Sequence, residues 1–452
     1  MNIVIIGGVA AGSKAAAKIK RLLPDAKVEI YTDDTHVSYS SCGLPYYIEG
    51  NFEDYKALLV RSVDEFKASG IDVYLQTKIE KILVKQKQVL ACSNEKAWLV
   101  DYDRLIIATG ARPLIPNIKG VKDFSNIYTL RKIEDGIIIR EKMLKSKKAV
   151  IIGSGFIGLE LLEAFVKNGL EVTVIERNSR IMSAFDPDMS TYIQARLEAI
   201  ENRTFEFITG EIVSEFIGEN GIVKSVKTLS GKEFDADLVI ISAGIIPNSE
   251  IAKEAGLELG ESGAIKVNKL MQTSEPNIYA CGDCCEEPHL VSGQSVWVPL
   301  GSTANKEGRC AALNAAGVYT LFEGVLGSAV SRCLNTTMSM TGLTESEAVA
   351  AGFTPVSATI SKSDKVGYMP DVGEITLKII ADKASGLLLG GQAIGSLGAD
   401  KRINSLTSAL LGHLTVSQFK NNDLTYAPPY SPTIDPLLDA MNILCGKISR
   451  RC

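Results

Sequence analysis

Two segments of the chain share one order of elements. Residues 2–31 read as an apolar strand, a glycine-rich turn, an alanine-rich helix and a second strand, and residues 148–176 repeat that order. Such a unit is typical of dinucleotide-binding sheets, because the glycines let the phosphates approach the helix N-terminus. Two copies predict an α/β fold with two nucleotide-binding domains.

The second glycine turn is complete and reads GSGFIG over residues 153–158. Glu176 ends the following strand, where a carboxylate can bind a ribose 2′-hydroxyl and would repel a 2′-phosphate. NADH is therefore favoured, although Arg177 follows directly and leaves NADPH open. The residues expected to bind this cofactor are Gly153, Gly155, Phe156, Ile157, Gly158 and Glu176.

The first glycine turn is less regular, because Val9 replaces its middle glycine in GGVAAG over residues 7–12. The stretches ATG at 108–110 and YACGD at 279–283 follow apolar runs and are expected beside this turn. They support a second nucleotide site. Its expected residues are Gly7, Gly8, Val9, Ala10, Gly12, Thr32, Asp33, Thr109, Gly110, Gly282 and Asp283.

The connections between the two units indicate their order along the chain. YDRLIIATGARPLIP is a strand followed by a Gly/Pro-rich crossing, and FDADLVIISAGIIPN has the same form. The first domain is therefore predicted to be discontinuous, 1–115 and 245–322, with the second domain inserted at 116–244. Residues 323–452 mix strands and helices without a glycine turn and predict a separate α+β domain.

Composition excludes several classes of protein. The net charge of −5 argues against nucleic-acid binding, and no apolar run of about 18 residues predicts a membrane span. The N-terminus enters a strand with no signal-peptide pattern, and the nine cysteines are irregularly spaced. We therefore expect a cytoplasmic protein, in which a special cysteine is usually catalytic.

Cys42 is that cysteine, because SYSSCGLPY places it shortly after the first nucleotide-binding unit. A thiol beside a dinucleotide predicts a redox centre. A nearby helix N-terminus and a flavin are expected to lower its pKa and favour the thiolate, which is the nucleophile.

Together these segments resemble the pyridine nucleotide–disulfide oxidoreductase superfamily over nearly the whole chain. The matching stretches are SYSSCGLPYYIEG, LIIATGARPLIP, AGIIPNSEIAKEAGLELGESGAIKVN, MQTSEPNIYACGD, VPLGSTANKEGR and DLTYAPPYSPTIDP. The resemblance implies FAD in the first domain, with Leu300 and Ala304 beside it, and NAD(P)H in the second. It also implies that the last domain dimerises, so a homodimer is expected.

Departures from the general pattern narrow the resemblance to the single-cysteine branch. This branch contains coenzyme A-disulfide reductases, NADH-dependent persulfide or polysulfide reductases, and NADH oxidases and peroxidases. Two-cysteine members carry CxxxxC, but the residue five after Cys42 is Tyr47. Oxidases and peroxidases usually carry a histidine where Ala10 stands, so peroxide cleavage is disfavoured.

The similarity to coenzyme A-disulfide reductases implies roles for two tyrosines. Tyr368 and Tyr426 match residues that approach the cysteine from the partner subunit in that family, although both could be packing aromatics.

The same resemblance implies a coenzyme A site, but lysines of some members are replaced by Gly70 and Ile434. Glutathione persulfide, polysulfide and bacillithiol-type disulfides therefore stay open as substrates. The expected substrate-binding residues are Lys14, Lys18, Arg21, Ser38 and Ser41, with Arg61 and Asn305 as further candidates.

The sequence thus predicts an FAD-dependent NAD(P)H oxidoreductase that reduces a sulfur–sulfur bond of a small molecule through Cys42. Two alternatives remain: a water-forming NADH oxidase that uses a Cys42 sulfenic acid, and a nonenzymatic flavoprotein redox sensor.

The remaining cysteines suggest no firm site. Cys281, Cys284 and Cys285, with His289 nearby, have the residue types of a metal site, but small packing residues are the favoured interpretation, so no metal is expected. Cys452 is a candidate resolving thiol.

Overall fold

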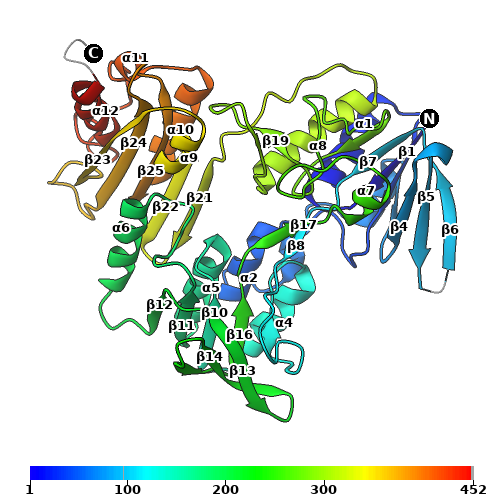
Figure 1. The fold of residues 1–452 in the computed structure, drawn as a ribbon, viewed down its shortest axis with the longest axis horizontal. Helices are drawn as coiled ribbons and strands as arrows, with labels where there is room; N and C mark the ends of the chain where they lie inside the picture. The colour runs from blue at the N-terminus through cyan, green and yellow to red at the C-terminus, as the bar shows by residue number, and fades with distance from the viewer. Residues whose placement is uncertain (95, 449–452) are drawn as a thin grey trace.

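The computed structural model describes residues 1–94 and 96–448. Three five-stranded sheets organise these residues, the first two parallel and the third antiparallel. Figure 1 shows each sheet with its own helices, from the N-terminal sheet at the right to the C-terminal sheet at the upper left. The predicted fold class, two Rossmann-like domains plus an α+β domain, is confirmed. Within the described ranges, no helix combines the length and apolar character that crossing a membrane requires.

The first sheet has the strand order β18-β7-β1-β2-β3. Its β1 side chains are buried because helices α1 and α8 pack together on one face and a three-stranded antiparallel sheet covers the other. The bounds are β1 Asn2–Ile6, β2 Lys27–Tyr31, β3 Ile71–Tyr74, β7 Arg104–Ile107, β18 Ile278–Ala280, α1 Ala10–Leu22, α8 Gly301–Ala315, β4 Lys78–Leu83, β5 Gln88–Ser93 and β6 Lys96–Asp101.

The second sheet repeats this plan with the order β12-β11-β10-β16-β9. Helices α4 and α5 bury apolar side chains against one face, and strands β13–β15 cover the other. The bounds are β9 Ile127–Tyr128, β10 Lys148–Ile152, β11 Glu171–Glu176, β12 Phe205–Thr209, β16 Leu238–Ile241, α4 Ile133–Met143, α5 Phe156–Lys167, β13 Val213–Glu219, β14 Ile222–Thr228 and β15 Glu233–Asp235.

The third sheet is antiparallel, with the order β21-β22-β25-β24-β23. Helices α10, α11 and α12 cover one face, while α6, which comes from the middle of the chain, contacts β22 and β25. The bounds are β21 Ala329–Cys333, β22 Thr336–Gly342, β23 Pro355–Ser363, β24 Glu374–Asp382, β25 Leu388–Gly395, α6 Pro187–Glu198, α9 Glu345–Ala350, α10 Ala399–Leu411, α11 Val416–Phe419 and α12 Pro436–Ile448.

Short elements connect the domains. Strands β8 and β17 pair antiparallel where the chain passes between the first and second sheets, and α2 packs against α4 and α5. The bounds of these connecting elements are β8 Ala111–Pro113, β17 Ile245–Pro247, α2 Leu44–Glu49, α3 Val63–Ala68, α7 Glu250–Glu254, β19 Glu287–Pro288 and β20 Ser295–Val296. The predicted domain boundaries at 115/116, 244/245 and 322/323 stay a prediction.

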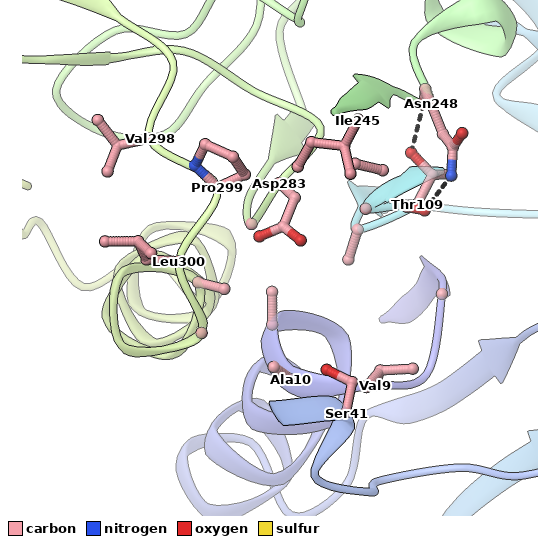
Figure 2. A pocket seen from close by; sticks show the side chains of 18 of the residues that line it. Val9, Ala10, Ser41, Thr109, Ile245, Asn248, Asp283, Val298, Pro299 and Leu300 are labelled. Atoms are coloured by element: carbon pink, nitrogen blue, oxygen red, sulfur yellow. Dashed lines mark hydrogen bonds between the residues drawn. The ribbon is translucent and has the colours of Figure 1, made fainter. Parts of the chain in front are cut away.

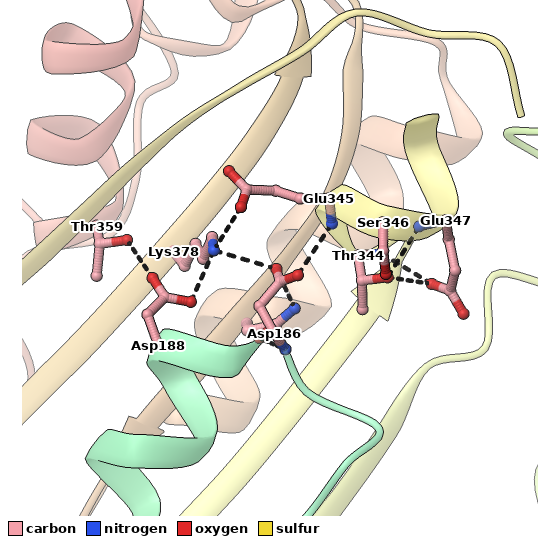
Figure 3. Close-up of polar contacts among 9 residues, drawn as sticks. Asp186, Asp188, Thr344, Glu345, Ser346, Glu347, Thr359 and Lys378 are labelled. Carbon is pink, nitrogen blue, oxygen red and sulfur yellow. Dashed lines mark hydrogen bonds and ion pairs between the residues drawn. The ribbon is translucent and has the colours of Figure 1, made fainter. Parts of the chain in front are cut away.

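A buried lysine joins α6 to the third sheet (Figure 3). Lys378 on β24 places its Nζ 2.7 Å from Asp188, 3.0 Å from Glu345 and 3.3 Å from Asp186. The side chains of Lys378 and Asp186 are 3% and 1% exposed, so this contact between distant parts of the chain is shielded from water.

Candidate active site

A cavity of about 2970 Å³ is lined by residues of both glycine turns and by Cys42. Its wall includes residues 38–42, 108–113 and 281–283, the start of α5 and the start of α8. Figure 2 shows the region around Asp283, where Val9 and Ala10, at the start of α1, face Val298, Pro299 and Leu300 across the cavity. The cavity therefore brings together segments separated by up to about 300 residues.

The first glycine turn forms a nucleotide cradle despite Val9. A Cβ on Gly7 would overlap the carbonyl oxygen of Ala108, and one on Gly12 would overlap that of Gly7. Val9 is the N-cap of α1 and lines the cavity, so its side chain is tolerated at the position of the middle glycine. The exposed N–H groups at the start of this helix suit a phosphate.

The second turn has the same geometry. A Cβ on Gly153 would overlap the carbonyl oxygen of Ser242, and one on Gly158 would overlap that of Gly153. A Cβ on Gly155 would meet no atom within 4 Å, so the backbone there is open to an approaching ligand. Phe156 and Ile157 line the cavity directly after it.

Glu176 lies at the end of β11, as predicted. Its Oε2 accepts hydrogen bonds from the backbone N and the Oγ of Ser154 at 3.0 and 2.7 Å, and its Oε1 accepts one from the backbone N of Asn178 at 2.8 Å. The carboxylate is 7% exposed and is thus fixed beside the turn.

The other residues predicted at the first nucleotide site surround the same space. The Thr109 Oγ1 donates to the backbone oxygen of Asn248 at 2.6 Å, and Asn248 Nδ2 returns a bond to the Thr109 oxygen at 2.9 Å (Figure 2). The cavity is also lined by Gly7, Gly8, Ala10, Thr32, Asp33, Gly110, Gly282, Asp283, Leu300 and Ala304.

These two cradles fit the adenine dinucleotides that the sequence predicts. Both have backbone N–H groups at a helix start and glycines that a Cβ would block. FAD, which the sequence resemblance implies, would be held in the first cradle.

Cys42 is exposed to this cavity in a short 3₁₀ turn, Ser41–Gly43, just before α2. A Cβ on Gly301, the first residue of α8, would lie 3.7 Å from its Sγ, so the thiol is close to the start of that helix.

The protein side chains around Cys42 raise the pKa of its thiol. Desolvation raises the pKa first, and the nearby carboxylates of Glu160 and Asp283 add to this. A bond with Ser41 and the charge of Arg131 act in the opposite direction but are outweighed. The lowering of this pKa that a helix N-terminus and a flavin are expected to cause stays a prediction.

Sequence reasoning missed two charged residues of this cavity. Arg131 places its Nη2 3.2 Å from the Oδ2 of Asp283, which lies 152 positions later in the chain. Glu160 on α5 accepts a hydrogen bond from Ser331 at 3.0 Å, and its burial raises its pKa to about 7. No spacing rule connects either residue with Cys42, so only the folded chain could identify them.

Most of the predicted substrate-binding residues lie at the cavity. Lys14, Arg21, Ser38, Ser41, Arg61 and Asn305 line it, whereas Lys18, on the same helix as Lys14, does not.

Two basic side chains near these residues are held by other parts of the chain. The Arg61 guanidinium lies over the Phe66 ring, 4.5 Å from its centroid. The Lys20 side chain packs against Gly70, where its Cε would lie 2.7 Å from a Cβ, and its Nζ donates to the backbone oxygen of Ala26 at 2.7 Å. Lys20 does not line the cavity.

Tyr368 and Tyr426 do not line the cavity of their own chain. They are 76% and 49% exposed and belong to the C-terminal domain, which Figure 1 shows apart from the first sheet. Cys281, Cys284 and Cys285 are buried. Cys452 lies outside the described residues.

Comparison with known proteins agrees with this geometry. Residues 1–308 match the model of the pyridine nucleotide-disulphide oxidoreductase family, and residues 333–437 match its dimerisation domain. The chain is 38% identical to an NAD(P)H sulfur oxidoreductase (CoA-dependent) of Pyrococcus abyssi over 98% of both chains. It is 31% identical to a coenzyme A disulfide reductase of Staphylococcus haemolyticus, over 95% of this chain and 96% of that one.

A solved structure shows the same fold. The NAD-dependent persulfide reductase of A. fulgidus superposes with a TM-score of 0.95 at 37% identity, covering 99% of this chain and 83% of that chain. The paired glycine cradles, the exposed cavity cysteine Cys42 and these matches lead to one conclusion: the chain belongs to the pyridine nucleotide-disulphide oxidoreductase family.

Proposed function

We propose that this protein is an FAD-dependent NAD(P)H oxidoreductase that reduces the sulfur–sulfur bond of a coenzyme A-type disulfide, persulfide or polysulfide through Cys42. The observation that carries the proposal is that this thiol opens into the cavity shared by both nucleotide cradles. The names of the Pyrococcus abyssi, Staphylococcus haemolyticus and A. fulgidus relatives support the same class of substrate.

The Cys42 thiolate attacks one sulfur of the substrate, forming a mixed disulfide and releasing the other sulfur as a thiol after protonation. FAD held in the first glycine cradle would supply two-electron transfer from NADH, and that electron pair would cleave the mixed disulfide at Cys42. Cleavage restores the thiolate and frees the second thiol, so one NADH and one proton reduce one disulfide to two thiols.

Tyr426 or Tyr368 of the second subunit protonates the leaving sulfur in this proposal. Lys14, Arg21 and Arg61 lie where they can pair with the phosphates of a coenzyme A moiety.

The direct test measures NADH oxidation by the purified flavoprotein with coenzyme A disulfide, coenzyme A persulfide or polysulfide, each under nitrogen, and with oxygen alone. We expect kcat/KM to be at least about tenfold higher for one of the sulfur substrates than for oxygen. A higher value for oxygen, with water as product, would assign the protein to the water-forming oxidases instead.

We predict a preference for NADH over NADPH, because a 2′-phosphate would face the fixed carboxylate of Glu176. Glu176→Gln, which keeps an oxygen acceptor but removes the charge, should raise kcat/KM for NADPH relative to NADH. The measurement is the ratio of the two kcat/KM values in each protein. The prediction would be rejected if kcat/KM of the wild-type protein were tenfold or more higher for NADPH than for NADH. A tenfold ratio corresponds to about 1.4 kcal/mol.

We predict a homodimer in which each active site uses residues of both subunits. Mixing Cys42→Ser and Tyr426→Phe subunits should restore activity, because each heterodimer would contain one site with both residues intact. Subunit exchange and a severe defect of Tyr426→Phe alone are the controls. Inactive heterodimers of verified composition, or an active monomer, would refute the shared site.

A further inference from the structure

The carboxylates of Glu287 and Glu307 and the thiol of Cys285 lie close together near the loop that carries Asp283. Cys285 and Glu287 follow Asp283 in the chain, and Glu307 lies on α8. Each offers one ligand atom within 4.8 Å of the other two. The three residues are only 1% to 2% exposed, and none lines the large cavity, so this cluster is separate from the candidate active site.

Glu307 lacks the partners that a buried carboxylate requires. Its Oε2 accepts a bond from the backbone N of Gly282 at 2.5 Å, but its Oε1 is fully buried with no hydrogen-bond partner in the described part of the chain. Across residues 1–94 and 96–448, no lysine or arginine forms an ion pair with Glu287 or Glu307. Glu287 Oε1 accepts one hydrogen bond, from the backbone N of Val298 at 3.0 Å, and the thiol of Cys285 is the one other donor near Oε2 of Glu307 among the bonds of the described residues. Two buried carboxylates with no cationic partner need a cation or protons.

We propose that Cys285, Glu287 and Glu307 bind one zinc-like divalent cation. A thiolate and two carboxylates are ligands that zinc accepts, whereas magnesium and calcium avoid sulfur. The Sγ of Cys285 is 3.7 Å from Oε2 of Glu307. This is close to the separation of two ligands on one tetrahedral zinc, given bonds of about 2.3 Å to sulfur and about 2.0 Å to oxygen.

The ion would have a structural role. It would join α8 to the loop of Asp283, whose carboxylate faces the cavity, and would thereby fix the position of that carboxylate. On binding, the Cys285 thiol becomes a thiolate and releases its proton to solvent, with no change of oxidation state.

The test measures zinc bound to the FAD-loaded protein. A Cys42→Ser background removes the exposed active-site thiol, which would otherwise compete for zinc. We expect one zinc per chain after dialysis, measured by elemental analysis, and a single affinity in a titration against a zinc indicator. Adding Glu307→Gln or Cys285→Ala should weaken binding by at least about tenfold.

The matched control is Cys310→Ala in the same background. Cys310 is also a buried thiol of α8, but it is not part of the cluster. It should leave zinc binding unchanged, and Glu287→Gln serves as a further ligand variant if Glu307→Gln does not fold. If the Cys42→Ser protein binds no zinc, or the ligand variants bind it as well as the control does, the proposal is wrong and the glutamates hold protons instead.

Discussion

Cys42→Ser is expected to lower kcat for sulfur–sulfur reduction by at least about 10³-fold, which is typical for loss of a catalytic nucleophile. The hydroxyl of serine cannot form the mixed disulfide on which the proposed reaction depends. The nucleotide cradles are built from other segments, so FAD content and the rate of flavin reduction by NADH should persist. Both are followed by flavin absorbance in a stopped-flow instrument, and turnover is followed by NADH consumption.

The matched control for this experiment is Cys92→Ser. Cys92 is a partly exposed thiol on β5, and it does not line the cavity. Its replacement should leave turnover within about twofold, since surface changes away from special features alter little. Reduction of coenzyme A disulfide or persulfide by Cys42→Ser at the wild-type rate would show that another group is the nucleophile.

Lys378→Met should destabilise the protein by about 3–5 kcal/mol, the usual cost of removing one partner of a buried ion pair. Burial lowers the pKa of Lys378, but its bonds with Asp188 and Glu345 outweigh this and raise the pKa overall, so the amine is charged at neutral pH. Methionine keeps most of the side-chain volume but leaves Asp186, which is 1% exposed, without its cation. The measurement is the shift of the denaturant unfolding midpoint of the flavoprotein.

Lys362→Met is the matched control for this charge deletion. Lys362 lies on the neighbouring strand β23, is 54% exposed and pairs with Asp439 at 3.4 Å. An exposed pair of this kind contributes about 0–1 kcal/mol. Equal shifts of the midpoint for the two variants would mean that burial of Lys378 adds nothing to stability.

Local sequence patterns were enough to predict both nucleotide-binding units. The glycines of a turn, the strand before it and the carboxylate at the next strand end lie within about 30 residues, and their spacing follows from one strand–helix–strand geometry. The structure agrees with these predictions in three features: the two parallel sheets, the position of Glu176 at the end of β11 and the location of Cys42 at the cavity. The role of Cys42 in turnover stays a prediction.

The charges that raise the pKa of Cys42 could not be found from its neighbours in the sequence. Glu160 and Asp283, which raise this pKa, are 118 and 241 positions away along the chain. A carboxylate at such a separation has no pattern that could reveal it. Gly70 likewise gave no sign that the side chain of Lys20 packs beside it.

The sequence by itself determined the two parallel sheets, their glycine cradles and the thiol that follows the first of them, because these features depend on contacts within single supersecondary units. Only the tertiary structure decided which charges surround that thiol, which lysine is buried against α6 and which carboxylates meet beside Cys285. These arrangements depend on side chains from distant segments meeting at a few ångströms. Hydrophobic periodicity sets the position of a segment but not the partner of each polar atom.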